Sequence, residues 1–386
     1  MNLKLDESYH RANRVALKVL HISPCFLDPH SDRNGGVAGY IKGLATAQAE
    51  AGLDVKVVFP NVDMGKKLSE PNTALKDGVE FECIENFFGK KGWFAAIRAA
   101  LDDVQIVHTH TPYSIRTEFA MALGAGRNIK FIVHSHGKFT AAFRQQRKFL
   151  KSVWEVIFWR FTVCKANRLI VSGIDEKKMC RNVGQFEIIS NGFDKRQYKP
   201  YDGEHHNDSY FLFVGALEPR KNVDLIIRAF ARVETPDVRL FIVGPDSCGL
   251  LMGLRDLSKK LGCEDRIEFK GPVFGQEKIS LMQQAKALVL VSKGEGMANV
   301  MMEAMGCHLP MIYSDGCVFS EIADIGGGLR VLPTQDNVAQ AMQRILFDDE
   351  LRAQQKSALA ELAGKYSWTK IALESRILYE KLLSET

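Results

Sequence analysis

The sequence predicts an α/β protein with two doubly wound parallel sheets that face each other across a cleft. Three observations support this fold class. Short apolar runs typical of buried strands alternate with amphipathic segments typical of helices along most of the chain. A polar stretch without periodicity at residues 198–209 interrupts the alternation. The length of 386 residues favours two to three domains.

The first series of strands and helices occupies residues 1–195. Its apolar runs predict strands at residues 17–23, 55–59, 79–84, 105–108, 131–134, 168–171 and 186–189. Helices are expected at residues 36–50, 92–101, 115–123, 145–164 and 175–182. Because these strands are apolar throughout, we expect a parallel sheet with helices on both faces.

The second series follows a linker at residues 196–209 and occupies residues 210–366. Strands are expected at residues 210–214, 239–243, 267–270, 287–291 and 310–314. Helices are expected at residues 223–233, 249–261, 276–285, 299–305, 338–347 and 351–366. A last helix lies within residues 367–386, and we expect it to pack back on the first domain.

The composition is that of a soluble globular enzyme, with 46% hydrophobic and 25% charged residues. No apolar run reaches the ~20 residues of a membrane span, and the first residues lack a secretory core. The eight cysteines form no Cys-x-x-Cys pair, which indicates reduced thiols in a cytosolic protein. The net charge is +5, but residues 127–168 alone carry +9, which favours anionic partners.

Two His-x-His pairs, His108/His110 and His134/His136, end predicted strands. We expect each pair to alternate faces, so that one imidazole of each points inward. No cysteine or carboxylate set accompanies the pairs, so we predict no metal site.

One stretch, residues 287–306, organises the second domain. A buried strand runs into a glycine-flanked acidic turn, and a helix begins near Asn299. Glu295 lies in the turn and Glu303 about one turn into the helix. Ligands bind at the carboxyl ends of such strands, free helix N–H groups suit phosphate, and a deeper carboxylate can reach sugar hydroxyls. Taken alone, the pattern also fits a solvated helix start with two surface glutamates.

Other strand ends of the second domain add candidate groups. A strand ends at Gly215, and the adjacent cations Arg220 and Lys221, which suit a diphosphate, precede a helix. Turns at Val243-Gly244 and at Gly271 to Val273 would let backbone approach a flat ring. The alternatives are a solvated helix cap for the cations and ordinary turn chemistry for the glycines.

The first domain offers two weaker candidates. Gly35-Gly36 precedes a helix and can present N–H groups to phosphate. His136 follows the strand at residues 131–134, where a neutral imidazole can hydrogen-bond a sugar hydroxyl or a backbone carbonyl. A structural histidine is the alternative.

Together these motifs resemble the retaining glycosyltransferases of the GT-B architecture, in the family-four group known as glycosyl transferases group 1. The resemblance runs from residue 17 to the closing helix. The matching motifs are Gly35-Gly36, His136-Gly137, Ser190-Asn-Gly-Phe-Asp194, Gly215-Ala-Leu-Glu-Pro-Arg-Lys-Asn222, Val243-Gly244, Gly271, Glu295-x7-Glu303 with Glu-Ala-Met305, and Pro310. The resemblance implies an acceptor-binding domain at residues 1–195 and a donor-binding domain at residues 210–366.

The resemblance also implies roles for individual residues. Arg220 and Lys221 would hold the diphosphate of a UDP- or GDP-linked sugar, so that neither a metal nor another cofactor is required. Glu303 would bind the ribose, and Glu295 and His136 would contact the donor sugar. The sugar or phosphate would meet the backbone at Gly296, Met297, Ala298, Asn299 and Val300. The phosphates would also meet the backbone at Gly35 and Gly36. The base would contact the backbone of residues 269–273. Attack on the same face, with the phosphate oxygen taking the acceptor proton, would retain configuration.

The sequence departs from the family pattern at three positions. Relatives often carry arginine at the position of Ala216, glycine or proline at that of Ala298, and glycine at that of His308. The missing arginine leaves Arg220 to supply that charge. We expect these changes to tune the donor pocket.

The evidence for the acceptor is a basic, aromatic segment from Arg144 to Phe161 (residues 144–161), which has apolar residues at helical spacing. Such a helix can lie on the anionic inner face of the cytoplasmic membrane, which would fit a lipid-linked acceptor in exopolysaccharide, capsule or lipopolysaccharide synthesis. An ordinary core helix is the alternative. We expect no nucleic-acid partner, because no base-reading motif accompanies the basic residues.

The sequence leaves two rival functions open. A nucleotide-sugar epimerase of the same architecture would need further acid and base carboxylates in the cleft. A non-catalytic nucleotide-sugar-binding scaffold would not need Glu295, Glu303, Arg220 and Lys221 to be intact.

Overall fold

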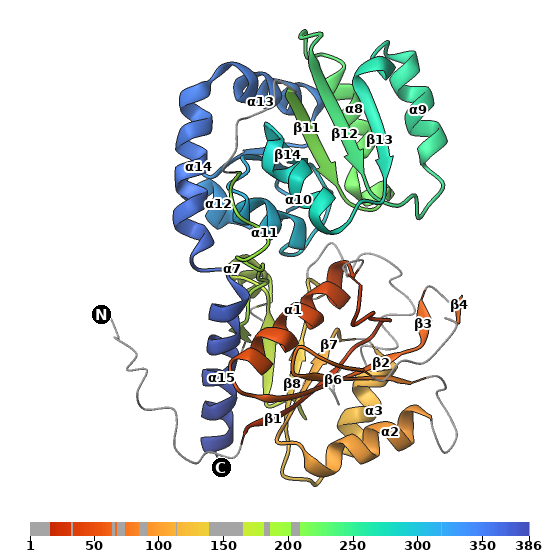
Figure 1. Ribbon diagram of the computed structural model, residues 1–386, viewed down its shortest axis with the longest axis vertical. Helices are drawn as coiled ribbons and strands as arrows, with labels where there is room; N and C mark the ends of the chain where they lie inside the picture. The colour runs from red at the N-terminus through yellow and green to blue at the C-terminus, as the bar shows by residue number, and fades with distance from the viewer. Residues whose placement is uncertain are drawn as a thin grey trace.

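The computed structural model consists of two α/β units stacked along the long axis of the molecule (Figure 1). It describes residues 16–31, 34–63, 66–67, 74–84, 92–112, 114–138, 165–180, 186–201, 209–317 and 319–385. The expected helix at residues 145–164 lies outside these residues. Each unit has its own parallel sheet, so the predicted fold class is confirmed.

The sheet of the first unit has the strand order β10-β9-β8-β7-β1-β2-β6-β5, and only β5 runs antiparallel to its neighbour. Its strands are β1 (Lys18–Ile22), β2 (Asp54–Pro60), β5 (Ala74–Lys76), β6 (Val79–Ile84), β7 (Ile106–His110), β8 (Lys130–His134), β9 (Arg168–Val171) and β10 (Phe186–Ile188). A separate ribbon pairs β3 (Val62–Asp63) with β4 (Lys66–Lys67).

Helices cover both faces of this sheet. One apolar cluster joins Val19 and Ile106 to α1 (Gly36–Glu50) and α15 (Trp368–Ser384). The other joins Leu20 and Val107 to α2 (Trp93–Ala100) and α3 (Ile115–Leu123). The remaining helices in the described part of this unit are η2 (Leu101–Asp103) and α7 (Ile174–Met179). Alternate residues of each strand therefore serve opposite faces, as the pleat requires.

The sheet of the second unit is parallel throughout, with the order β13-β12-β11-β14-β15-β16. Its strands are β11 (Ser209–Val214), β12 (Val238–Val243), β13 (Ile267–Gly271), β14 (Ala287–Leu290), β15 (Met311–Ser314) and β16 (Gly328–Val331). Its helices are η4 (Pro219–Lys221), α8 (Val223–Phe230), α9 (Leu251–Lys260), η5 (Glu264–Arg266), α10 (Gly275–Gln284), α11 (Asn299–Gly306), α12 (Ser320–Asp324), α13 (Gln335–Phe347) and α14 (Asp349–Ala363). The short elements α12 and β16 were not predicted.

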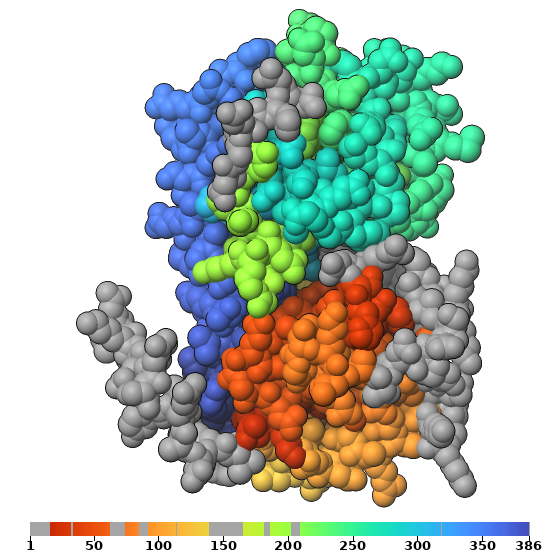
Figure 2. Space-filling view, viewed as in Figure 1, coloured from red at the N-terminus to blue at the C-terminus, as the bar shows by residue number. Residues whose placement is uncertain are grey.

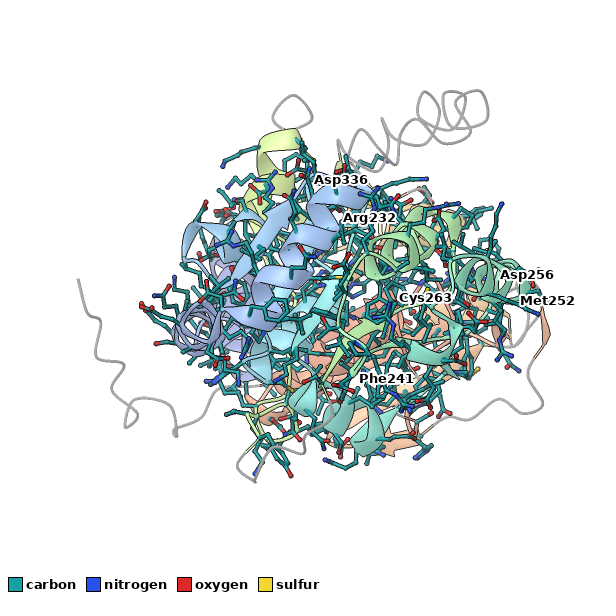
Figure 3. All side chains as sticks on the ribbon, turned by 90° about the horizontal axis from the view of Figure 1, so that it is seen from above. Arg232, Phe241, Met252, Asp256, Cys263 and Asp336 are labelled. Carbon is teal, nitrogen blue, oxygen red and sulfur yellow. The ribbon has the colours of Figure 1, made fainter. Side chains whose placement is uncertain are left out.

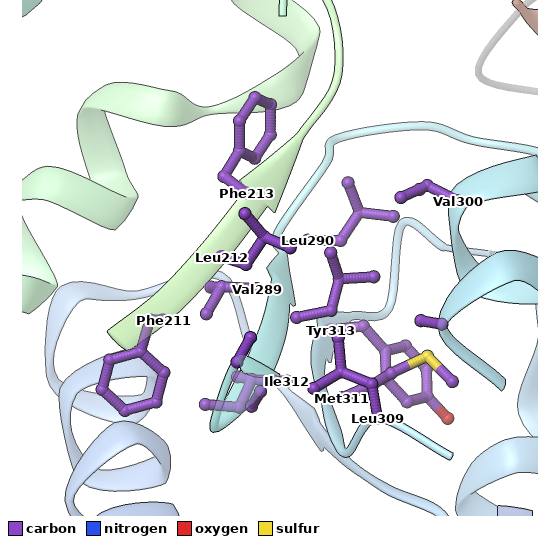
Figure 4. Close-up of a cluster of buried hydrophobic side chains, with 14 of the residues drawn as sticks. Phe211, Leu212, Phe213, Val289, Leu290, Val300, Leu309, Met311, Ile312 and Tyr313 are labelled. Carbon is purple, nitrogen blue, oxygen red and sulfur yellow. The ribbon is translucent and has the colours of Figure 1, made fainter. Parts of the chain in front are cut away.

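The core of the second unit lies between its central strands and their helices. Side chains of β11, β14 and β15 interdigitate there, among them Phe213, Leu290 and Tyr313 (Figure 4). At the periphery, Arg232, just after α8, forms an ion pair with Asp336 of α13 (Figure 3).

The closing helix connects the two units. α14 lies beside the second sheet, and α15 continues from it along the first unit (Figure 1). Gln48 of α1 donates hydrogen bonds to Ser375 and Tyr379 of α15 at 2.8 and 3.0 Å. In the space-filling view, the yellow-green residues 186–201 lie where the two units meet (Figure 2).

Candidate functional site

In the second unit, β11 and β12 are each followed by a glycine and β13 ends in one. These three residues form one edge, which we name the glycine rim (Gly215, Gly244 and Gly271). The amide of Gly215 donates to the carbonyl of Val243 at 2.9 Å, and the amide of Gly244 donates to Gly271 at 2.8 Å. Gly244 has a φ of +144°, and a Cβ there would lie 1.9 Å from the carbonyl oxygen of Gly215. The close approach of these strand ends therefore requires glycine at position 244.

A pocket of about 340 Å³ opens at the glycine rim. Its lining includes Leu217, Gly244, Asp246, Phe269 and Gly271. Val243 and Val273, two of the predicted donor-binding residues, are buried at 1% and 8% exposure, so they can offer a ligand only backbone groups.

Arg220 and Lys221 lie in η4, beside the glycine rim. The Cβ position of Gly215 is 3.6 Å from Nζ of Lys221. Asn222, in the left-handed conformation at φ +55°, ends this turn and starts α8, and its side chain donates to the carbonyl of Val291 at 3.2 Å. The turn is thereby fixed against the loop that carries Glu295.

Both cations bind the same carboxylate oxygen. Oε1 of Glu295 lies 2.5 Å from Nη1 of Arg220 and 2.5 Å from Nζ of Lys221. Arg220 also pairs with Glu218 at 2.6 Å. Burial lowers the pKa of Arg220, but the carboxylates of Glu295 and Glu218 outweigh burial and raise it. The site therefore holds two positive charges whose positions are fixed by contact with the carboxylate of Glu295.

Glu295 itself is held by backbone hydrogen bonding. Its amide donates to the carbonyl of Gly316 at 2.8 Å. The next residue, Gly296, packs against the first unit, and a Cβ at Gly137 would lie 3.3 Å from its Cα. The acidic turn therefore touches the loop that carries His136.

Glu303 lies on α11 and binds two side chains that the sequence analysis did not single out. Its Oε1 accepts hydrogen bonds from the hydroxyl of Tyr198 at 3.0 Å and from Nζ of Lys278 at 2.8 Å. Lys278 comes from α10, and Tyr198 from the segment between the two units. No sequence motif signals this pairing, because the three residues are far apart in the chain.

Asn299, the first residue of α11, joins the two units. Its Nδ2 donates to the carbonyl of Gly36 at 2.9 Å, and its Oδ1 accepts from Asn191 at 2.8 Å. Asn191 also donates to the carbonyl of Met297 at 2.5 Å. The predicted residues of the two glycine-rich turns are thus in direct contact, and Ala298 occupies the N-cap position of α11.

Gly35 and Gly36 leave space at the start of α1. A Cβ built on either residue meets nothing within 4 Å, and Gly36 has a φ of +52°. The amides at the start of α1 can therefore be approached by a ligand. Val300 of α11 is buried in the core of the second unit at 9% exposure.

His136 lies in a strained turn at φ +47°. Glu176 of α7 holds this turn: it accepts hydrogen bonds from the amide of Gly137 at 2.8 Å, the amide of Ser172 at 2.9 Å and the hydroxyl of Ser135. Burial raises the pKa of Glu176, and the three hydrogen bonds act in the opposite direction. Sequence reasoning missed Glu176, which has the spacing of an ordinary helix-surface residue.

The expected orientation of the His-x-His pairs is wrong. Residues i and i+2 of a strand point to the same face, so His108 and His110 share the face covered by α1 and α15. His134 and His136 lie on the same side, because both rings contact Tyr40 of α1. The four histidines stack with His21 of β1 in a histidine cluster (His21, His108, His110, His134 and His136), with ring centroids 4.0 Å apart for His134 and His136. Burial, the largest cause, lowers the pKa of every member.

Comparisons with known proteins agree with this geometry. The sequence model of "Glycosyltransferase Family 4" matches residues 34–197, and that of "Glycosyl transferases group 1" matches residues 194–361. The phosphatidyl-myo-inositol mannosyltransferase of Mycolicibacterium smegmatis is 26% identical over 376 residues, which cover 91% of this chain and 92% of the relative.

Two further comparisons concern ligands of other proteins. The N-acetylgalactosamine-N,N'-diacetylbacillosaminyl-diphospho-undecaprenol 4-alpha-N-acetylgalactosaminyltransferase of Campylobacter jejuni is 29% identical over 195 residues, or 49% of this chain and 52% of that one. The crystal structure of Anabaena Alr3699/HepE in complex with UDP and glucose has a TM-score of 0.74 at 17% identity, and covers 95% of this chain and 100% of that chain.

The two facing parallel sheets and the matched models define a glycosyltransferase of the GT-B type. The chain belongs to the glycosyl transferases of group 1. Among the described residues, none of the helices has both the length and the apolar character needed to cross a bilayer.

Proposed function

We propose that this glycosyltransferase moves a hexose or an N-acetylhexosamine from a UDP- or GDP-linked donor to a lipid-linked or polysaccharide acceptor. The observation that carries the proposal is the shared contact of Arg220 and Lys221 with Glu295 beside the glycine-rim pocket. The UDP and glucose in the Alr3699/HepE complex support the donor class. The diphospho-undecaprenol acceptor in the name of the C. jejuni relative supports the acceptor class.

The donor nucleotide would lie along the glycine rim. The pocket takes the base against backbone near Gly271, and Glu303, held by Tyr198 and Lys278, accepts hydrogen bonds from the ribose hydroxyls. Arg220 and Lys221 bind the diphosphate together with the first amides of α11. Two fixed cations can neutralise this group, which is the basis for proposing that the reaction requires no metal.

The sugar of the donor would lie between the two units. Glu295 and His136 contact its hydroxyls from opposite sides, because their turns touch at Gly296 and Gly137. Gly35 and Gly36 leave room for the phosphates on the side of the first unit. These contacts fix the reactive carbon near the acceptor.

The proposed reaction retains the configuration of the sugar. The bond between the anomeric carbon and the phosphate oxygen breaks while the acceptor oxygen bonds to the same face of that carbon. The departing phosphate oxygen takes the acceptor proton. Arg220 and Lys221 stabilise the charge on the leaving nucleotide, and such preorganised charge is a large part of catalysis in buried sites.

The acceptor assignment places the enzyme in surface-polysaccharide synthesis at the inner face of the cytoplasmic membrane. Its support from this chain is the basic, aromatic composition of residues 144–161, which lie outside the described structure. Binding to vesicles with and without anionic lipid tests this part of the proposal.

The activity test is the consumption of UDP- and GDP-linked sugars by the purified protein with and without EDTA. The proposal expects one donor to yield free nucleoside diphosphate at an unchanged rate in EDTA, and NMR of the product to show the donor's anomeric configuration. An epimerase would convert the sugar without transferring it to an acceptor, and a scaffold would leave every donor intact. Either of these results would contradict the proposal.

A further inference from the structure

Four buried or partly buried side chains form a continuous hydrogen-bonded histidine chain (Gln48, His21, His110 and His136). Oε1 of Gln48 lies 2.7 Å from Nε2 of His21, Nδ1 of His21 lies 2.9 Å from Nε2 of His110, and Nδ1 of His110 lies 3.0 Å from Nε2 of His136. Gln48, His21 and His110 are fully buried. The chain therefore leads from the α1–α15 interface to the proposed sugar site.

The contacts of Gln48, at the end of the histidine chain away from His136, determine which atom donates in each of its hydrogen bonds. The hydroxyl of Ser375 donates to the carbonyl of Ala372 at 2.8 Å, so its oxygen can only accept from Gln48. The amide nitrogen of Gln48 faces Ser375 and Tyr379, and its carbonyl oxygen faces His21. Nε2 of His21 must then carry a proton and donate.

Because the imidazoles are neutral, the same order of donor and acceptor continues from His21 to His136 along the histidine chain. Burial lowers the pKa of His21 to about 4 and the pKa values of His110 and His136 well below the usual value. A neutral imidazole has one donor and one acceptor nitrogen. Nδ1 of His21 therefore accepts from Nε2 of His110, and Nδ1 of His110 accepts from Nε2 of His136.

We propose that the histidine chain holds His136 in the tautomer protonated on Nε2, so that its Nδ1 accepts a hydrogen bond from a hydroxyl of the donor sugar. Among the described residues, none hydrogen-bonds to Nδ1 of His136, and the residue is partly exposed. A phosphate oxygen cannot donate, so this nitrogen selects the sugar and not the diphosphate. Gln48 and Ser375 are thus positioning residues. The choice of ligand rests on the proposed function, whereas the tautomer does not.

A bound metal is the competing explanation of the same residues. Two groups, His21/His108/His110 and His110/His134/His136, have nitrogens within 4.8 Å of one another. The contacts of 2.9 and 3.0 Å are hydrogen-bond lengths, whereas two nitrogens on a tetrahedral zinc lie about 3.3 Å apart. Neither group includes a carboxylate to offset a buried divalent charge. Hydrogen bonding is therefore the better account.

The direct test is NMR of the full-length protein labelled with ¹⁵N-histidine at pH 7. Two-bond proton–nitrogen correlations report which ring nitrogen carries the proton, and the His136→Gln variant assigns the signals. The proposal expects protonated Nε2 and unprotonated Nδ1 for His136. A proton on Nδ1, a doubly protonated ring, or stoichiometric metal in the purified protein would overturn it.

Two variants test the positioning role. Gln48→Met removes the acceptor at His21, and we expect His136 to become a mixture of tautomers and kcat to fall on the order of tenfold, with UDP affinity unchanged. Ser375→Ala removes one of the two acceptors that orient the amide of Gln48, so we expect a smaller shift towards mixed tautomers and a smaller loss of kcat. An unaltered His136 tautomer in a folded Gln48→Met protein would contradict the role of Gln48.

The two proposals fail in different ways. If the wild type has the expected tautomer but consumes no nucleotide-sugar, the donor sugar is wrong as the ligand of Nδ1, and the proposed tautomer of His136 is still supported. If the enzyme is active while His136 carries its proton on Nδ1, the histidine chain is wrong and the proposed function stands.

Discussion

Nζ of Lys221 lies 2.5 Å from Oε1 of Glu295, and the lysine side chain is 9% exposed. A diphosphate that binds Lys221 must therefore compete with a carboxylate already in place. Arg220 contacts the same oxygen, so Glu295 would oppose the proposed nucleotide binding while it orients both cations. This relationship separates the contribution of Glu295 to nucleotide binding from its contribution to sugar transfer.

We expect Glu295→Gln to bind free UDP or GDP at least as tightly as the wild type, because the competing negative charge is removed. Turnover of the sugar donor should fall by about 10–100-fold, the cost of a charged hydrogen bond to the sugar. Calorimetry and a donor-consumption assay check the two effects. Weaker nucleotide binding together with unchanged turnover would show that Glu295 supports the phosphates and not the sugar.

The role of Glu303 can be tested with the ligand as well as the protein. The wild type should bind the ribonucleoside diphosphate about 10–100-fold more tightly than its 2′-deoxy or 3′-deoxy analogue. Glu303→Gln should lose most of that discrimination for one of the two analogues. Equal discrimination in wild type and variant would remove Glu303 from the ribose site.

Two glycine substitutions should affect stability in opposite directions. Gly244→Ala places a methyl group 1.9 Å from the carbonyl oxygen of Gly215, and we expect a loss of at least about 2 kcal/mol. Gly253→Ala, on α9 with open space around its Cβ, should gain about 0.4–1 kcal/mol. Urea unfolding measures both values, and a neutral Gly244→Ala would contradict the packing of the glycine rim.

The histidine cluster predicts a loss of stability in mild acid. Its five imidazoles have lowered pKa values in the folded protein, about 4 for His21, whereas unfolded histidines titrate near 6.5. The unfolded state therefore takes up protons first, so stability is full above pH 6.5 and is lost as the pH falls towards 4. Each imidazole adds up to about 1.4 kcal/mol per pH unit.

Urea unfolding between pH 7.5 and pH 5 checks this dependence. The raised pKa of Glu176 acts in the opposite sense, because its protonated form is favoured in the folded state, but it is one carboxyl against five imidazoles. His21→Gln should reduce the slope by removing one titrating group. A free energy of unfolding that stays constant over this range would contradict a neutral, buried cluster.

Much of the fold could be predicted from the sequence because central parallel strands are apolar throughout. The predicted strand at residues 79–84 and helix at residues 115–123 coincide with β6 and α3. β16 was missed because this edge strand is only partly buried and has no continuous apolar run. β5 is a three-residue antiparallel edge strand, too short for a periodicity.

The candidate site could be predicted only where its residues share one local motif. Glu295 and Glu303 belong to a strand–turn–helix unit that is visible in the sequence. Lys278 pairs with Glu303, and Asn191 with Asn299, only when distant segments of the sequence pack together. No residue spacing in the sequence therefore predicts these pairs. The histidine cluster was misread because the rule for strand faces was applied to residues two apart as if they were adjacent.

The central claim is that Lys221 holds the diphosphate of a nucleotide donor. Calorimetric titration of UDP and of GDP into the wild type, Lys221→Met and the exposed control Lys259→Met, with and without Mg²⁺, tests it most directly. We predict that one nucleotide binds the wild type and the control equally, without need of Mg²⁺, and binds Lys221→Met at least about tenfold more weakly. Equal binding by wild type and Lys221→Met, or no binding of either nucleotide to the wild type, would contradict the account.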